Sequence, residues 1–285
     1  MPNPSFVIPL FLQSALLPFG VALMVLLVLR QARLARLAPL LAVALGFLVS
    51  YGAVYHAQWS FLPHQSLDWL PWIVLIGGAG AWLADAAATT VVRHGVRLLV
   101  SLLCVGLVAW PAAASGGLAQ PALSIAVAVL LMFAAWTYLG TAAQQRPTPA
   151  VMLLVVAGGA ALALMLDASQ LLGQLCGALA AALMACIAFN VPRVRTAFSG
   201  AGAGLAVVLL GTLLTNAYIY AGFSLASVLL LAGGLLADPL VLVFNRLRQR
   251  SDGVGSWVTA GVLTAIPVLA TIGLAIRAAQ ESGGY

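Results

Sequence analysis

Two aspartates, Asp85 and Asp238, occupy the positions in this sequence that most suggest chemistry. Each follows a Leu-Ala pair inside a long apolar run, and each lies eight residues before an arginine. At 1.5 Å per helical residue, each aspartate is about 12 Å from that arginine along the helix axis. Because an ionised Asp inside a bilayer costs roughly 2.5–3.5 kcal/mol, it must be paired, protonated or hydrated there. Such a carboxylate can couple transport to a proton or a cation, or it can hold two helices together through a hydrogen bond.

Further polar groups fall in two places. Asn216 and Thr215 lie in one apolar run and Tyr51 in another that aligns with it. We expect these three to line a polar path, unless they serve only as hydrogen-bonded contacts between helices. The segment 56–70 is rich in aromatic rings, which are seldom left in water. We expect it to be an external loop that lies on the membrane surface, caps the bundle or contacts a partner subunit. Its expected contact residues are His56, Trp59, His64, Asp68 and Trp69.

The residue types that are missing exclude other chemistry. The chain has no lysine, and Glu281 is its only glutamate, which excludes a lysine Schiff base and a pair of buried glutamates. Cys104, Cys176 and Cys186 lie inside apolar runs without metal-binding spacing. We therefore predict no catalytic residues, no metal and no cofactor, and we do not expect an enzyme.

The composition places all these residues in a membrane. Hydrophobic residues make up 64% of the 285 residues, charged residues make up 6%, and the mean hydropathy is +1.12. A soluble domain carries about 25% charged residues. The net charge of +6 comes from arginines at the ends of apolar runs, which is a topology signal and not a nucleic-acid-binding surface. The sequence predicts a single all-α domain over 1–285, a polytopic transmembrane helical bundle.

The apolar runs predict ten spans, since about 20 helical residues cross a bilayer. The expected bounds are 6–29, 37–55, 71–91, 97–111, 121–141, 149–166, 169–190, 200–220, 223–245 and 254–276. If the first span runs uncleaved from outside to inside, eleven of the twelve arginines are cytoplasmic, as the positive-inside rule requires. These are Arg30, Arg33, Arg36, Arg93, Arg97, Arg146, Arg193, Arg195, Arg246, Arg248 and Arg250. Both termini are then outside.

An internal repeat is predicted around the two aspartates. Residues 80–97 align with 233–250 through a shared Gly, a Leu-Ala-Asp sequence and two arginines. We therefore expect spans 1–4 (6–111) and spans 7–10 (169–276) to form a parallel repeat, with 121–166 between them. Chance matching of Leu- and Ala-rich helices is the alternative.

Glycines near both aspartates suggest interrupted helices. The pairs at 77–78 and 233–234 each precede an aspartate, and glycine at equivalent positions of two halves can mark broken helices around a site. Close helix packing is the alternative. It is also the role that we expect for Gly173 and Gly177, which are four residues apart.

Two functions remain open from the sequence. The first is a small secondary transporter or permease, coupled through the buried aspartates. The alternative is a non-catalytic accessory or scaffold subunit of a larger membrane complex. The expected partners are the lipid bilayer and, in the second case, other membrane subunits or further copies of the chain, with no nucleic acid. We expect the protein in the cell membrane, specifically a bacterial inner membrane. The abundance of arginine without lysine is typical of a GC-rich genome.

Overall fold

The computed structural model describes residues 9–32, 34–116, 119–190, 198–237, 239–241 and 254–281. Within these ranges the chain forms helices and no β-strand. The elements are a π-helical turn η1 (Leu12–Leu16), a 3-10 turn η2 (Ser66–Trp69) and the α-helices α2 (Leu17–Gln31), α3 (Ala38–Tyr55), α4 (Leu70–Ala86), α5 (Thr90–Gly116), α6 (Ala119–Ala143), α7 (Thr148–Asp167), α8 (Gln170–Phe189), α9 (Gly200–Tyr220), α10 (Leu225–Leu235) and α12 (Val254–Glu281).

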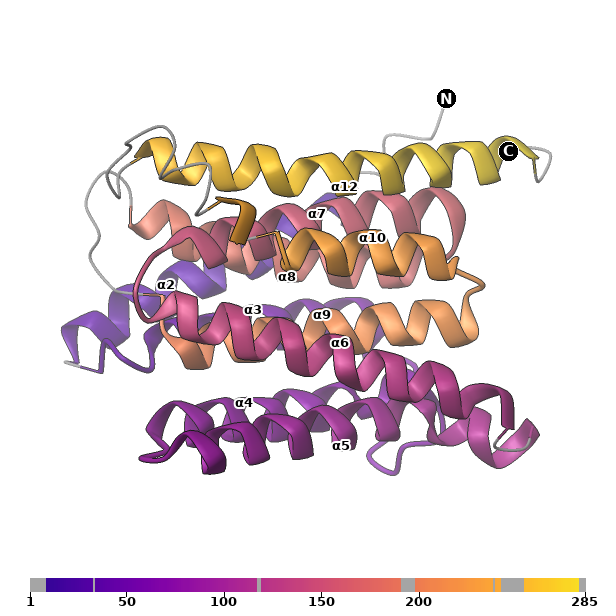
Figure 1. Cartoon of the computed structure of the whole chain (residues 1–285), viewed down its shortest axis with the longest axis horizontal. Coiled ribbons are helices and arrows are strands. Elements are labelled where there is room, and N and C mark those ends of the chain that lie inside the picture. The colour runs from indigo at the N-terminus through magenta and orange to yellow at the C-terminus, as the bar shows by residue number, and fades with distance from the viewer. Residues whose placement is uncertain are drawn as a thin grey trace.

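The helices lie side by side, and α9 runs through the middle of the bundle (Figure 1). The most apolar stretch of α9 is 83% buried, more than in any other long helix of the described residues. Glycines allow its neighbours to approach closely: Gly204 lies against the ring of Trp136, and Gly211 lies against Met132, both on α6. The polar groups of Thr212, Thr215 and Asn216 on α9 are therefore surrounded by other helices and not by lipid.

Successive helices are antiparallel, so the bundle has two distinct ends. We call one the arginine end, because it holds the turns after α2, α4 and α6. Its described arginines are Arg30, Arg36, Arg93, Arg97 and Arg146. We call the other the loop end, because it holds the 56–70 loop and the end of α9. Of the described arginines, only Arg277, near the end of α12, lies there. The side of the membrane that each end faces stays a prediction.

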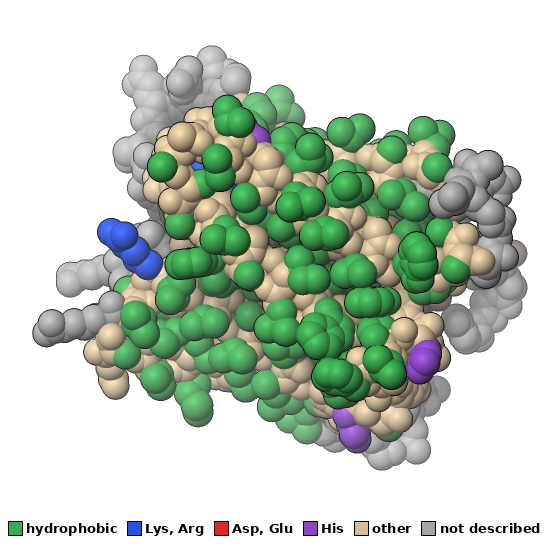
Figure 2. Space-filling model, turned by 90° about the horizontal axis from the view of Figure 1, so that it is seen from below, with side chains coloured by type: hydrophobic (Ala, Val, Ile, Leu, Met, Phe, Trp, Pro, Cys, Tyr) green, Lys and Arg blue, Asp and Glu red, His purple; other side chains and the backbone are tan. Residues whose placement is uncertain are grey.

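The surface between the two ends is apolar. Figure 2 shows a face on which hydrophobic side chains cover the middle, an arginine projects at one end and histidines lie mainly at the other. Large exposed side chains on α4 and α5, such as Leu75, Trp82, Leu99 and Leu102, are at least half exposed. Among the described residues, nine helices are long and apolar enough to cross a bilayer. This surface therefore fits lipid and not water.

The boundary between the third and fourth predicted spans is corrected by the structure. The sequence predicts spans over 71–91 and 97–111, but α4 ends at Ala86 and α5 begins at Thr90. The chain turns at Ala87, whose backbone is extended (ψ 126°). Ala87 and the next residue are apolar, so hydropathy does not mark this turn.

This turn changes the setting of the first aspartate. Thr89 caps α5, since its Oγ1 accepts a hydrogen bond from the N–H of Val92 (3.3 Å). Asp85 therefore lies in the last turn of α4, close to the arginine end, and not about 12 Å before Arg93 along one continuous helix. Arg93 and Arg97 belong to the next helix, which packs against α4.

The ninth predicted span, 223–245, is also corrected. Its first helix, α10, has 11 residues and ends at Leu235, just after the glycine pair 233–234. The chain turns at Leu236, and helical residues resume at Pro239. Glycine destabilises a helix and proline cannot continue one, so this interruption has a local cause.

The predicted repeat stays a prediction. Asp238 and residues 242–250, which carry half of the alignment, lie outside the described residues. In Figure 1, α4 and α10 run in the same direction, from the loop end to the arginine end, which is a condition that a parallel repeat requires.

Candidate functional site

The 56–70 loop is folded around one buried carboxylate. Asp68 is 1% exposed, and its Oδ2 accepts hydrogen bonds from the backbone N–H groups of His64 (3.0 Å) and Gln65 (2.9 Å). Asp68 is the third residue of η2 and forms a reciprocal capping box with Gln65. Hydrogen bonds to a charged acceptor contribute about 1.5–3 kcal/mol. Asp68 therefore fixes the path of the loop.

Three side chains tie this loop to the bundle. On α3, the Tyr51 hydroxyl donates to the carbonyl of Leu67 (3.1 Å), and the Tyr55 hydroxyl donates to Oε1 of Gln65 (3.2 Å). On α9, Nδ2 of Asn216 donates to Oγ of Ser66 (2.8 Å). The loop is thus held against α3 and α9.

A cavity of about 420 Å³ lies at the loop end, between this loop and the ends of α5, α8 and α9. Its rim is exposed at His64 and Gln65. With His64 neutral, the residues that line the cavity carry no formal charge. These residues are His64, Gln65, Ser66, Leu67, Pro111, Ser169, Leu172, Asn216, Tyr220 and Ala221. The wall therefore offers hydroxyl, amide and imidazole groups beside apolar surface.

Tyr220 fixes the end of α5 in this wall. Its hydroxyl accepts a hydrogen bond from the N–H of Ala112 (3.1 Å) and donates to the carbonyl of Val108 (3.0 Å). Pro111 lies inside α5 at the same turn. Because proline cannot donate to the helix ladder, this turn is open to insertion of a side chain. The hydroxyl of Tyr220 thus couples α9 to α5 where both helices line the cavity.

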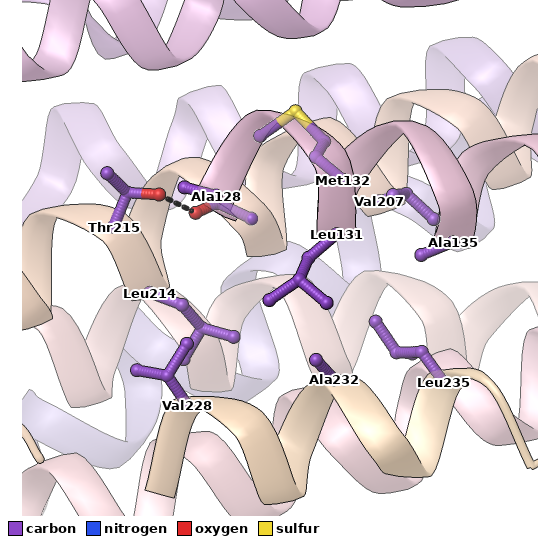
Figure 3. A pocket seen from close by; sticks show the side chains of 11 residues that line it. Ala128, Leu131, Met132, Ala135, Val207, Leu214, Thr215, Val228, Ala232 and Leu235 are labelled. Atoms are coloured by element: carbon purple, nitrogen blue, oxygen red, sulfur yellow. Dashed lines mark hydrogen bonds between the residues drawn. The ribbon is translucent and has the colours of Figure 1, made fainter. Parts of the chain in front are cut away.

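The structure brings together part of the predicted polar path. Tyr51 and Asn216 both contact the 56–70 loop. Thr215 lies on a different face of α9: its hydroxyl donates to the carbonyl of Gly211 (2.7 Å), and it lines a small apolar groove between α6, α9 and α10 (Figure 3). Neighbouring helical residues are about 100° apart around the axis, which separates 215 from 216.

The loop residues predicted to make contacts also divide into two groups. Asp68 is buried, and Trp69 is half-buried and packs against the core. His56 and Trp59 are exposed. The ring of Trp59 contacts Phe61, which is itself exposed. The inward part of the loop shapes the cavity, and the outward part forms an aromatic surface.

At the arginine end, Asp85 joins three helices. Its Oδ1 accepts a hydrogen bond from Nε2 of Gln144, just after α6 (2.6 Å). It also lies against Gly200, the first residue of α9, where a helix carries about half a unit of positive charge. A Cβ at Gly200 would be 2.6 Å from Oδ1 of Asp85 and 2.9 Å from the carbonyl of Gly140. Asp85 therefore fills the space that this glycine leaves.

Arg97 lies in the same junction. It is 2% exposed, its Nη1 donates to the carbonyl of Thr137 on α6 (3.3 Å), and its Nε has no hydrogen-bond partner among the described atoms. It is close enough to Asp85 and Arg93 to interact with both electrostatically. The hydrogen bonds of Arg97 and Asp85, together with the contact at Gly200, connect the ends of α4, α5, α6 and α9. Whether Asp85 also couples transport stays a prediction.

Sequence reasoning missed four polar residues that line the cavity, namely Gln65, Ser66, Ser169 and Tyr220. Local signals existed for two of them. Gln65 and Asp68 have capping-box spacing, and Ser169 is the N-cap of α8, accepting from the N–H of Leu172 (3.4 Å). These signals mark turns, but they do not show that the turns meet.

The fold and this site define a class: the protein is a multi-pass helical membrane protein. No protein-family model matches the chain, and no curated protein matches it at a significant level. Within the described ranges, no group of three or more His, Cys, Asp or Glu side chains could hold a metal ion.

Proposed function

We propose that the protein is a small secondary transporter or permease of a bacterial inner membrane, whose solute binds in the loop-end cavity. The observation that carries this proposal is the position of the cavity: a space of about 420 Å³ with a partly polar wall, at the end of α9, the most buried long helix described. Solute sites in transporters combine a concave space with a few polar groups between helices. By the positive-inside rule the loop end faces outside, so the cavity opens to the external solution.

The proposed route continues along α9. Thr212 lies one turn from Asn216 toward the arginine end, on the same face of the helix, and is 0% exposed. Its hydroxyl is bonded to the carbonyls of Val208 and Leu209 (2.9 Å each). In this conformation the proposed route is closed between the cavity and the arginine end. Passage therefore requires the helices around α9 to separate, as alternating access does in other transporters.

Cysteines on α9 test this route. We expect Thr212→Cys to react with a membrane-impermeant thiol reagent in intact cells, because an outward-opening state exposes it. Leu213→Cys, also 0% exposed but turned about 100° away, should remain unreacted. The measurement is the modification rate by mass shift, with the buried native cysteines as background. Equal reactivity of the two variants indicates general loosening. An unreactive Thr212→Cys contradicts the proposed route.

Coupling through Asp85 and Asp238 is the second part of the proposal. A coupling carboxylate changes its protonation as the transporter changes conformation, so the reactivity of Thr212→Cys should vary with pH after normalisation to an exposed cysteine at Ala57. Asp85→Asn and Asp238→Asn should each remove this variation, and Asp252→Asn is the control. For Asp85, asparagine keeps an oxygen that can accept from Gln144. A variation that persists in both variants rules out coupling through these residues.

A second candidate function, an accessory subunit of a membrane complex, is favoured by the aromatic surface of the loop. Phe61 is 66% exposed, Leu62 is 69% exposed, and Phe61 contacts the ring of Trp72 (5.6 Å between centroids). Aromatic rings of this kind suit a protein interface as well as the headgroup region. A scaffold needs no moving route, so in this case Thr212→Cys stays unreactive.

A further inference from the structure

Two carboxylates flank the segments that line the loop-end cavity. Asp68 follows directly on lining residues 64–67, and Asp167 lies two residues before Ser169. Asp68 is 1% exposed, and its Oδ1 has no hydrogen-bond partner among the described atoms. No arginine of the described residues is within ion-pair distance of either carboxylate; the ion pair recorded among those residues joins Arg277 to Glu281 on α12 (2.7 Å). Among the described residues, therefore, no positively charged side chain pairs with either carboxylate.

Charge is distributed unevenly along the bundle. The arginine end holds five described arginines and Asp85, whereas the loop end holds Asp68, Asp167 and the paired Arg277 and Glu281. Low-dielectric surroundings strengthen the field of a buried charge. The partial charges of two helix ends offset one another at the cavity, because the negative C-terminus of α9 and the positive N-terminus of α8 both reach it. With His64 neutral, Asp68, which is bonded to the backbone of the lining residues His64 and Gln65, is consequently the formal charge that lies directly behind the wall.

The wall also limits the kind of cation. A bare metal ion needs several oxygen ligands at short range, and about 420 Å³ is far more space than it fills. Apolar surface from Leu67, Pro111 and Leu172 suits alkyl groups, and the ring of Tyr220 suits an ammonium group. These features favour an organic cation over a metal ion.

We infer that the loop-end cavity binds a small organic cation, a protonated amine or a quaternary ammonium, and that Asp68 supplies the charge that selects it. This inference deepens the proposed function, on which its transport step rests. Binding itself does not depend on transport. Asp68 acts on the ligand through the field behind the wall, while the groups of the wall touch the ligand.

The test measures the potential inside the cavity with two thiol reagents of similar size and opposite charge. Ala221 lines the cavity, and Ala221→Cys places a reactive group there with little change in size. We expect the cationic trimethylammonium-ethyl thiosulfonate to react at least about tenfold faster than the anionic sulfonato-ethyl thiosulfonate, relative to the same ratio for a free thiol. Asp68→Asn should lower this ratio at least threefold. Ala88→Cys at the arginine end, beside Arg93, is the matched control and should not favour the cation.

Protection by a ligand completes the test. Tetramethylammonium chloride should slow modification of Ala221→Cys, while sodium chloride at the same ionic strength should not. Asp68→Asn could lower the ratio by loosening the loop. The comparison of the two salts uses a protein that keeps Asp68, so it tests cation binding independently of that effect. The inference of a cation site is overturned if Ala221→Cys reacts faster with the anionic reagent, or if both salts protect it equally. Failure of Thr212→Cys to react removes transport but leaves this ratio intact, so the two failures are distinguishable.

Discussion

Gly173→Ala is expected to lower the free energy of unfolding by about 1–3 kcal/mol, the usual cost of overpacking a tight contact. A Cβ at Gly173 would be 2.8 Å from the carbonyl oxygen of Ala161 and 3.1 Å from the backbone nitrogen of Met165, both on α7. Because these are backbone atoms, rotation of a side chain cannot relieve the contact. The helices α7 and α8 would have to move apart, and they form one of the most extensive helix–helix contacts in the bundle.

Gly177→Ala is the matched control on the same helix. Its Cβ would be 3.8 Å or more from its nearest neighbours, which is ordinary van der Waals contact. We expect its effect on the free energy of unfolding to stay within about 0.5 kcal/mol, and alanine's better helix propensity works in its favour. Unfolding in mixed micelles, followed by circular dichroism, measures both variants. Equal stability of the two would show that α7 and α8 are not as close at Gly173 as the structure places them.

Asp68→Ala is expected to release the 56–70 loop from the bundle. The substitution removes the acceptor of two backbone N–H groups, and hydrogen bonds to a charged group contribute about 1.5–3 kcal/mol each. A loss of that size raises the amide exchange rate by about ten- to a hundredfold or more where exchange follows local opening. Hydrogen exchange of residues 60–69, read by mass spectrometry, measures the effect.

Asp68→Asn and His56→Ala separate the causes. Asparagine keeps an oxygen that can accept from His64 and Gln65, so its exchange rates should lie much closer to those of the unaltered protein. His56 is exposed, so His56→Ala should leave the exchange of 60–69 unchanged. Unchanged exchange in Asp68→Ala would contradict the anchoring role of this carboxylate and, with it, the fixed wall of the cavity.

Much of the architecture follows from local sequence. A helix crosses a bilayer when about 20 apolar residues follow one another, and this criterion needs no knowledge of neighbouring helices. It placed most of the helices to within a few residues, α3, α7, α8 and α9 among them. It failed at Ala87, where the chain turns within an apolar stretch, and at α10, which is too short to count as a span.

The site itself depended on tertiary structure. Thr215 and Asn216 are neighbours in sequence and equally polar, yet one faces the groove beside α6 and the other the cavity, because they point about 100° apart on α9. Gly173 and Gly177 form one motif, yet only at Gly173 would an added Cβ be too close to backbone atoms of α7. Such differences arise where separate helices meet.

The sequence by itself determined that the protein is a helical membrane protein, because hydropathy and charge act on each segment separately. It also identified Asp68, His64 and Asn216 as candidate contact or path residues. Only the tertiary structure decided that His64 and Asn216 line one cavity whose loop Asp68 anchors, and that Asp85 bridges α4, α6 and α9 at the opposite end. Contacts between residues distant in the chain depend on how α5, α8 and α9 pack, and that packing is a property of side-chain shapes taken together.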